Sequence, residues 1–156
     1  MKTARLLAFL FGFAALAAAE APTEAKPAAQ WPTGSYSRSD FGHEQSAWRI
    51  WSAEGWRKFW HEQVRSEAPP APDFAKGSVV VVAGGECPSG GYSAEITRAV
   101  REDEAWIVEF IVRRPPPGAF VAMALTYPAA VAFFEGVELG QRPRWRDMTP
   151  REEKAR

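Results

Sequence analysis

The sequence has little of the chemistry on which most catalytic and metal sites depend. Its 156 residues include one cysteine and two histidines. A single thiol cannot close an intramolecular disulfide, and one cysteine with His43 and His61 gives no zinc-ligand spacing. Lysine plus arginine number 19, and so do aspartate plus glutamate. This balance gives no support to nucleic acid or an anionic membrane as a partner, because both attract basic surfaces.

Catalytic motifs are also missing. A triad needs a nucleophile, a base and an orienting acid in contact, and neither histidine has a recognisable nucleophile motif nearby. The acidic run 102–104 lacks the alternating oxygen ligands of a calcium loop. A phosphate-binding glycine loop leads into a helix, but no helical pattern follows the glycine pairs 84–85 and 90–91. We therefore expect structural or surface histidines, no metal, no cofactor and no enzyme. A catalytic site would need Ser, Tyr, Asp and Glu alone.

The first residues have the pattern of a secretory signal peptide. Lys2 and Arg5 precede the uncharged apolar run Leu6–Ala19, which ends in three alanines suited to signal peptidase. The run is shorter than the about 20 residues of a membrane helix, which favours cleavage near Ala19 over an uncleaved anchor. No cysteine follows to accept a lipid, and no second long apolar run exists. We expect a secreted or periplasmic protein without a membrane span after cleavage.

Changes in composition divide the chain into four parts. We expect a signal peptide over 1–19, a Pro/Ala-rich linker over 20–36, one folded domain over 37–140 and a charged C-terminal tail over 141–156. The linker prediction depends on its prolines and on the scarcity of residues that could be buried. In the tail, Thr149–Glu152 has capping-box spacing, but too few residues follow to stabilise a helix.

One helix is predicted near the start of the domain. Ser46–Trp51 is typical of a short strand, and Ser52 is a suitable helix N-cap. The next aromatic and aliphatic residues share one helical face: Trp56, Phe59, Trp60 and Val64. Trp51 falls outside both apolar patterns, and we expect it to be exposed.

The rest of the domain has the pattern of strands and turns. Val79–Ala83 predicts a strand buried on both faces, Tyr92–Thr97 a half-buried strand and Trp106–Val112 a central strand. Two further strands are expected over Phe120–Tyr127 and Ala130–Phe134, separated by Pro128. Short strands with turn signals predict a mainly β fold, either an antiparallel β-sandwich or a partly open barrel, with one short N-terminal helix. An α+β arrangement is also left open.

Two loops hold the candidate binding residues: Ser89, Gly90, Gly91, Tyr92, Pro117 and Gly118. The adjacent glycines permit positive φ and close backbone approach, and Tyr92 would anchor its loop in the sheet. The alternative is that the glycines only satisfy a tight connection between strands. Cys87 lies next to an apolar strand, and no nearby base would activate its thiol. We therefore expect Cys87 to be buried and not available to a partner.

Several motifs together resemble the PrcB C-terminal domain family, named for an accessory subunit of a bacterial protease complex. They are the helix ending in Trp60, Pro72-Asp73-Phe74, Val79–Gly85 followed by Ser89–Ile96, and Pro117-Gly118 followed by Leu125–Pro128. The resemblance implies an exported, non-catalytic interaction module. Its partner would be an exported or envelope protein, with a protease as one candidate, bound through loops 86–92 and 114–119.

A second resemblance is to chagasin-type cysteine-protease inhibitors, which present three loops at one end of a β-sandwich. Ser89–Tyr92 is similar to their Thr-Gly-Tyr element, and Arg142–Trp145 is similar to their Arg-Pro-Trp element. The inserted Gly91 and Arg144 depart from these patterns. This resemblance implies a loop-wedge protease inhibitor as the alternative function.

Overall fold

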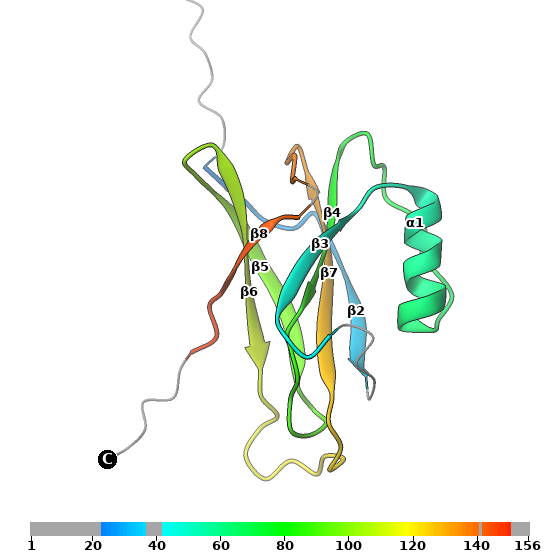
Figure 1. Cartoon of the computed structure of the whole chain (residues 1–156), viewed down its shortest axis with the longest axis vertical. Coiled ribbons are helices and arrows are strands. Elements are labelled where there is room, and N and C mark those ends of the chain that lie inside the picture. Colours follow the sequence, from blue (N-terminus) through cyan, green and yellow to red (C-terminus); the bar gives the residue numbers. More distant parts are fainter. Residues whose placement is uncertain (1–22, 37–41, 141, 151–156) are drawn as a thin grey trace, which may run out of the picture.

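The computed structural model describes residues 23–36, 42–140 and 142–150, and shows two four-stranded sheets packed face to face (Figure 1). The predicted signal peptide, residues 1–19, lies outside the described residues. One sheet has the order β1-β5-β6-β8 and the other β2-β7-β4-β3. The strands are β1 Glu24–Ala25, β2 Ala29–Tyr36, β3 Ser46–Ile50, β4 Gly77–Ala83, β5 Ser93–Glu102, β6 Ala105–Arg113, β7 Tyr127–Glu135 and β8 Arg144–Asp147. All pairs are antiparallel except β6 with β8, and the predicted sandwich is confirmed.

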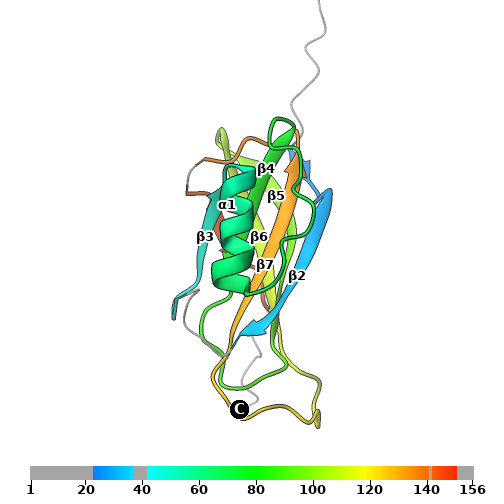
Figure 2. The ribbon, with the colours of Figure 1, turned by 90° about the vertical axis from the view of Figure 1, so that its right-hand side faces the viewer.

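Strand β4 is buried on both faces, as its β-branched sequence predicts. Val80 and Val82 point into the core between the sheets, with Ile96, Phe110 and Phe134. Val79 and Val81 point the other way, into a second core beneath the helix. Figure 2 shows the helix covering the outer face of the β2-β7-β4-β3 sheet. Strand β6 is central, between β5 and β8, as predicted.

The helix begins at the predicted cap. The Ser52 hydroxyl accepts a hydrogen bond from the Gly55 amide at 3.1 Å. Helix α1 (Ala53–Lys58) continues as the π-helical segment η2 (Phe59–Val64), a change that the 3.6-residue pattern does not reveal. All four predicted face residues, Trp56, Phe59, Trp60 and Val64, are buried. Trp51 is half exposed, as expected, with the Arg49 guanidinium 4.0 Å from its ring centroid.

The predicted linker is wrong for residues 24–25 and 29–36, which form β1 and β2. Strand β2 pairs with β7 along its length, and the Trp31 ring contacts the Trp56 ring at 4.7 Å. Composition misleads here because β2 is an edge strand, where a proline such as Pro32 can be accommodated without a ladder hydrogen bond. The partly buried Trp31 side chain packs against the core beneath the helix.

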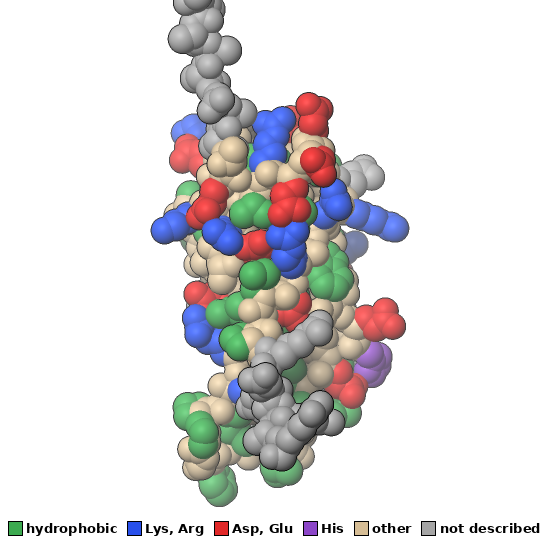
Figure 3. Space-filling view, turned by 90° about the vertical axis from the view of Figure 1, so that its left-hand side faces the viewer, with side chains coloured by type: hydrophobic (Ala, Val, Ile, Leu, Met, Phe, Trp, Pro, Cys, Tyr) green, Lys and Arg blue, Asp and Glu red, His purple; other side chains and the backbone are tan. Residues whose placement is uncertain are grey.

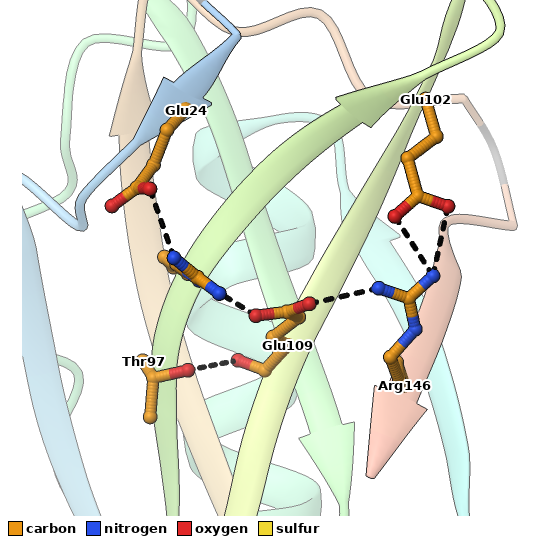
Figure 4. A network of polar contacts seen from close by, with 6 residues as sticks. Glu24, Thr97, Glu102, Glu109 and Arg146 are labelled. Carbon is orange, nitrogen blue, oxygen red and sulfur yellow. Dashed lines mark hydrogen bonds and ion pairs between the residues drawn. The ribbon is translucent and has the colours of Figure 1, made fainter. Parts of the chain in front are cut away.

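The predicted charged tail is wrong for residues 144–147, which form β8 against β6. Besides the backbone ladder and the contact of the Trp145 ring with Phe110, a network of charged side chains links β8 to the sheet (Figure 4). Glu109 on β6 is only 3% exposed and receives hydrogen bonds from Arg98 Nε at 2.6 Å and from an Arg146 amino group at 2.9 Å. Arg146 also binds Glu102 at 2.8 Å, and Arg98 binds Glu24 at 2.9 Å. This network therefore links β1, β5, β6 and β8.

The predicted strand Phe120–Tyr127 and the predicted break at Pro128 are both wrong. Residues 118–125 form a loop, and β7 starts at Tyr127 and continues through Pro128. Proline is tolerated because it is the second residue of β7 and lies opposite a register irregularity in β2. Its carbonyl accepts a hydrogen bond from the Gly84 amide at 2.7 Å.

Candidate functional site

The two loops that carry the predicted binding residues lie side by side at one end of the sandwich, the lower end in Figures 1 and 2. Cys87 and Thr126 exchange backbone hydrogen bonds at 2.8 and 3.0 Å, and the Gly90 amide donates to the Ala122 carbonyl at 2.8 Å. The Thr126 hydroxyl donates to the Ser89 carbonyl at 2.6 Å. The loop between β4 and β5 therefore holds the loop between β6 and β7 in place.

The glycine pair allows this close approach. Gly90 is buried, and a Cβ atom there would lie 3.3 Å from the Ala122 nitrogen. Gly91 has φ of +79°, and a Cβ atom there would lie 2.8 Å from Val121 Cγ1 and 2.9 Å from Pro115 Cβ. The geometry gives both glycines a supporting role, since they face the second loop. Direct partner contact by Ser89–Tyr92 stays a prediction.

Pro117 and Gly118 form the central pair of a β-turn. The Ala119 amide donates to the Pro116 carbonyl at 3.0 Å, and Gly118 has φ of +78°. Proline followed by a glycine with positive φ is the pattern of a type II turn. The turn fixes the direction in which the chain leaves the Pro115–Pro117 segment, so both predicted residues shape the loop.

The loop that they shape exposes a group of large apolar side chains. Phe120 is 107% exposed relative to its reference, Met123 89% and Leu125 50%. No charged residue occurs between Pro115 and Thr126. Figure 3 shows hydrophobic side chains projecting at the lower end of the molecule. We call residues 115–126 the apolar loop. In the sequence, this loop is an uncharged run after three prolines, and its hydrophobicity predicts a strand instead of an exposed loop.

A small polar cluster lies at the same end. Glu86 accepts hydrogen bonds from Tyr127 Oη at 2.9 Å and from His43 Nδ1 at 2.7 Å. The bonds from His43 and Tyr127 lower the pKa of the Glu86 carboxyl. Desolvation and the bond to Glu86 raise the pKa of Tyr127. The cluster joins the loop before β3, the loop after β4 and the start of β7, and so supports the base of the apolar loop.

Cys87 and His61 have the environments expected of them. Cys87 is 6% exposed, and desolvation raises the pKa of its thiol, which disfavours the reactive thiolate. His61 is exposed on the helix.

Arg142–Trp145, the segment similar to the Arg-Pro-Trp element of chagasin-type inhibitors, lies at the other end of the sandwich. Arg144 pairs with Ile107 near the start of β6, whereas the glycine loop leads into Ser93, which pairs with Arg113 at the end of β6. Ser89–Tyr92 and Arg142–Trp145 therefore do not form one loop surface, as a wedge inhibitor of that type requires.

Within residues 23–36, 42–140 and 142–150, no group of three or more His, Cys, Asp or Glu side chains could hold a metal ion. In the same ranges, no helix has the length and hydropathy needed to cross a bilayer.

Comparison with known proteins gives one family. Residues 78–135 match the family model described as PrcB C-terminal. No curated protein and no solved structure matches the chain. The matched segment runs from β4 to the end of β7 and includes both loops of the candidate site. Over residues 78–135, this chain is therefore similar to the PrcB C-terminal family, which supports the resemblance stated from the sequence.

Proposed function

We propose that this protein is an exported, non-catalytic interaction module that binds a component of a protease complex through its apolar loop. The observation that carries the proposal is the exposure of Phe120 and Met123 on a loop fixed by hydrogen bonds. Water contact with such side chains is unfavourable, and burying one stabilises a complex by about 1.5–3 kcal/mol. Clustered apolar side chains on a protein surface are typical of interaction sites.

Preorganisation of the loop favours binding. Its path is set at the Pro116–Ala119 turn, at the Gly90–Ala122 hydrogen bond and at the Cys87–Thr126 pair. A loop held in its bound conformation loses less conformational freedom when the complex forms. Phe120 and Met123 can therefore act as anchors for a pocket on the partner, as aromatic residues commonly do in interfaces.

The match to the PrcB C-terminal family model supports the identity of the partner. The PrcB C-terminal family is associated with a subunit of a protease complex, which favours a protein partner of that kind. The signal-like segment before residue 20 supports a meeting outside the cytoplasm, in the periplasm or medium. The candidate site also contains a high-pKa thiol instead of an activated nucleophile, which supports a non-catalytic role.

The test is crosslinking of the tagged full chain in the exported fraction, followed by identification of the captured protein. Wild type should capture a protease or a protease-complex subunit, and Phe120→Ser should reduce capture at least fivefold. Trp51→Ser is the matched control, because Trp51 is half exposed and follows β3 at the opposite end of the sandwich. Equal capture by wild type and Phe120→Ser would contradict the proposal.

A further inference from the structure

The middle of the apolar loop is open between two fixed points. One is the turn Pro116–Ala119, and the other is the hydrogen bond from the Gly90 amide to the Ala122 carbonyl at 2.8 Å. The two residues between these points belong to no helix, strand, turn or bend. The amide and carbonyl of Phe120, the first of the two, make no backbone hydrogen bond with any residue that the structure describes. A partner could therefore bind this backbone without breaking a bond within the chain.

The Phe120 side chain is open at the same place. Phe120 is fully exposed, on a loop that projects beyond the ends of the strands (Figure 1). The next residue, Val121, is half-buried and packs against Gly91, where a Cβ atom would lie 2.8 Å from Val121 Cγ1. Met123 is also exposed, but it lies in a bend. Phe120 therefore presents a free ring and a free backbone together, next to a residue that is held in place.

A free backbone and one large side chain are what a protease cleft recognises in a substrate. Such a cleft binds a short segment along its backbone, and the S1 pocket receives the side chain before the bond to be cut. An anchor pocket elsewhere on a protein needs only the side chain. The small residues Gly118 and Ala119 before Phe120 leave room for the walls of a cleft. The S1 pocket must accept a large apolar group, since no charged residue occurs between Pro115 and Thr126.

We infer that Phe120 enters the S1 pocket of the protease itself, and that the chain is a substrate-like inhibitor of that protease. The inference rests on the proposed function for a partner in a protease complex, and it names the component and the site that are bound. Because the loop is fixed on both sides of Phe120, it loses little conformational freedom in the cleft. The same fixed points would hold the two ends together if the Phe120–Val121 bond were cut.

The experiment titrates the full chain into α-chymotrypsin and trypsin, and follows the hydrolysis of a small chromogenic substrate of each. The S1 pocket of chymotrypsin is a hydrophobic slot, whereas that of trypsin contains an aspartate. Wild type should inhibit chymotrypsin competitively and leave trypsin active at the same concentrations. Phe120→Arg should exchange the two specificities. It should inhibit chymotrypsin about tenfold less than wild type does, as expected on loss of an interface anchor, and it should inhibit trypsin.

Trp51→Arg is the matched control for the exchange. It also replaces an exposed aromatic ring by arginine, but at the opposite end of the sandwich, so it should behave as wild type with both proteases. Mass spectrometry should find the Phe120–Val121 bond intact after an incubation in which chymotrypsin cuts the urea-unfolded chain. The inference is overturned if wild type does not inhibit chymotrypsin, if Phe120→Arg does not exchange the specificities, or if the folded chain is cut after Phe120 as fast as the unfolded one.

The two proposals fail separately. If Phe120→Ser abolishes capture of a protease-complex component but the exchange of specificity is not seen, the loop binds outside a substrate cleft and only this inference fails. If the exchange is seen and wild type captures no component of a protease complex, only the proposed function fails.

Discussion

Gly91 packs directly against Val121, so that a Cβ atom on the glycine would lie 2.8 Å from Val121 Cγ1. The contact joins the two loops at the end of the sandwich and sets the position of the apolar loop. It also explains why a glycine with positive φ occupies this place.

We expect Gly91→Ala to destabilise the fold by more than Gly118→Ala. Both glycines have positive φ, which costs an alanine about 1–2 kcal/mol. Only Gly91 also has a neighbour in the way, because nothing lies within 4 Å of a Cβ atom at Gly118. Overpacking should add about 1–3 kcal/mol at Gly91. Urea unfolding of both variants measures the difference, and equal losses would refute the close contact.

Removing residues 1–36 should prevent folding, although those residues look like a leader and a linker. A chain that begins at residue 37 lacks β2, the strand that pairs with β7, and loses the Trp31–Trp56 contact. A chain that begins at residue 23 keeps both and should unfold cooperatively. Circular dichroism with thermal melting compares the two. A cooperative transition at the same temperature in the shorter chain would contradict the assignment of β2.

Glu109→Gln should cost about 1.5–3 kcal/mol of stability, the usual range for hydrogen bonds to charged groups. The Glu109 side chain is only 4% exposed and is the acceptor for both Arg98 and Arg146. Glu95→Gln serves as the control, since the Glu95–Arg113 pair is exposed and should contribute less than about 1 kcal/mol. Denaturant titration of both variants should separate them, and similar losses would show that the buried carboxylate has no special role.

Stability should depend on the ionisation of Glu102. Its hydrogen bond from Arg146 lowers the pKa of the carboxyl from the ordinary value of 4.5. A carboxyl with a lowered folded-state pKa stabilises the fold above its unfolded-state pKa, and this contribution is lost as the pH falls through the folded-state pKa. Wild type should therefore be more stable than Glu102→Gln at pH 7, and the difference should shrink as the pH falls below 4.5 and through the lowered folded-state pKa. A difference that does not change with pH would contradict the pairing.

The parts of the fold that the sequence predicts are those governed by local apolar pattern. The run Val79–Ala83, the alternation around Phe110 and the capped helix after Ser52 each specify their element. Strands β2 and β8 have no such pattern, because one is held by Trp31 packing on Trp56 and the other by Arg146 pairing with Glu109. Both attachments join residues far apart in the chain, which local pattern cannot reveal.

The sequence indicates where the two loops lie but not which side chains they expose. Glycine and proline are typical of turns, so Gly90, Gly91, Pro117 and Gly118 predict the positions of both loops. The exposure of Phe120 and Met123 is not predicted, because Phe120–Leu125 has the hydrophobicity of a strand. These side chains are exposed because the turn at Gly118 and the hydrogen bond at Ala122 direct the run away from the core.

The most direct test of the central claim compares capture by Phe120→Ser and by Trp51→Ser in the exported fraction. Each variant removes one exposed aromatic ring, and the two rings lie at opposite ends of the sandwich. We expect Phe120→Ser to lose the proposed protease-complex partner and Trp51→Ser to retain it. Retention by Phe120→Ser, or equal loss by both variants, would contradict binding through the apolar loop.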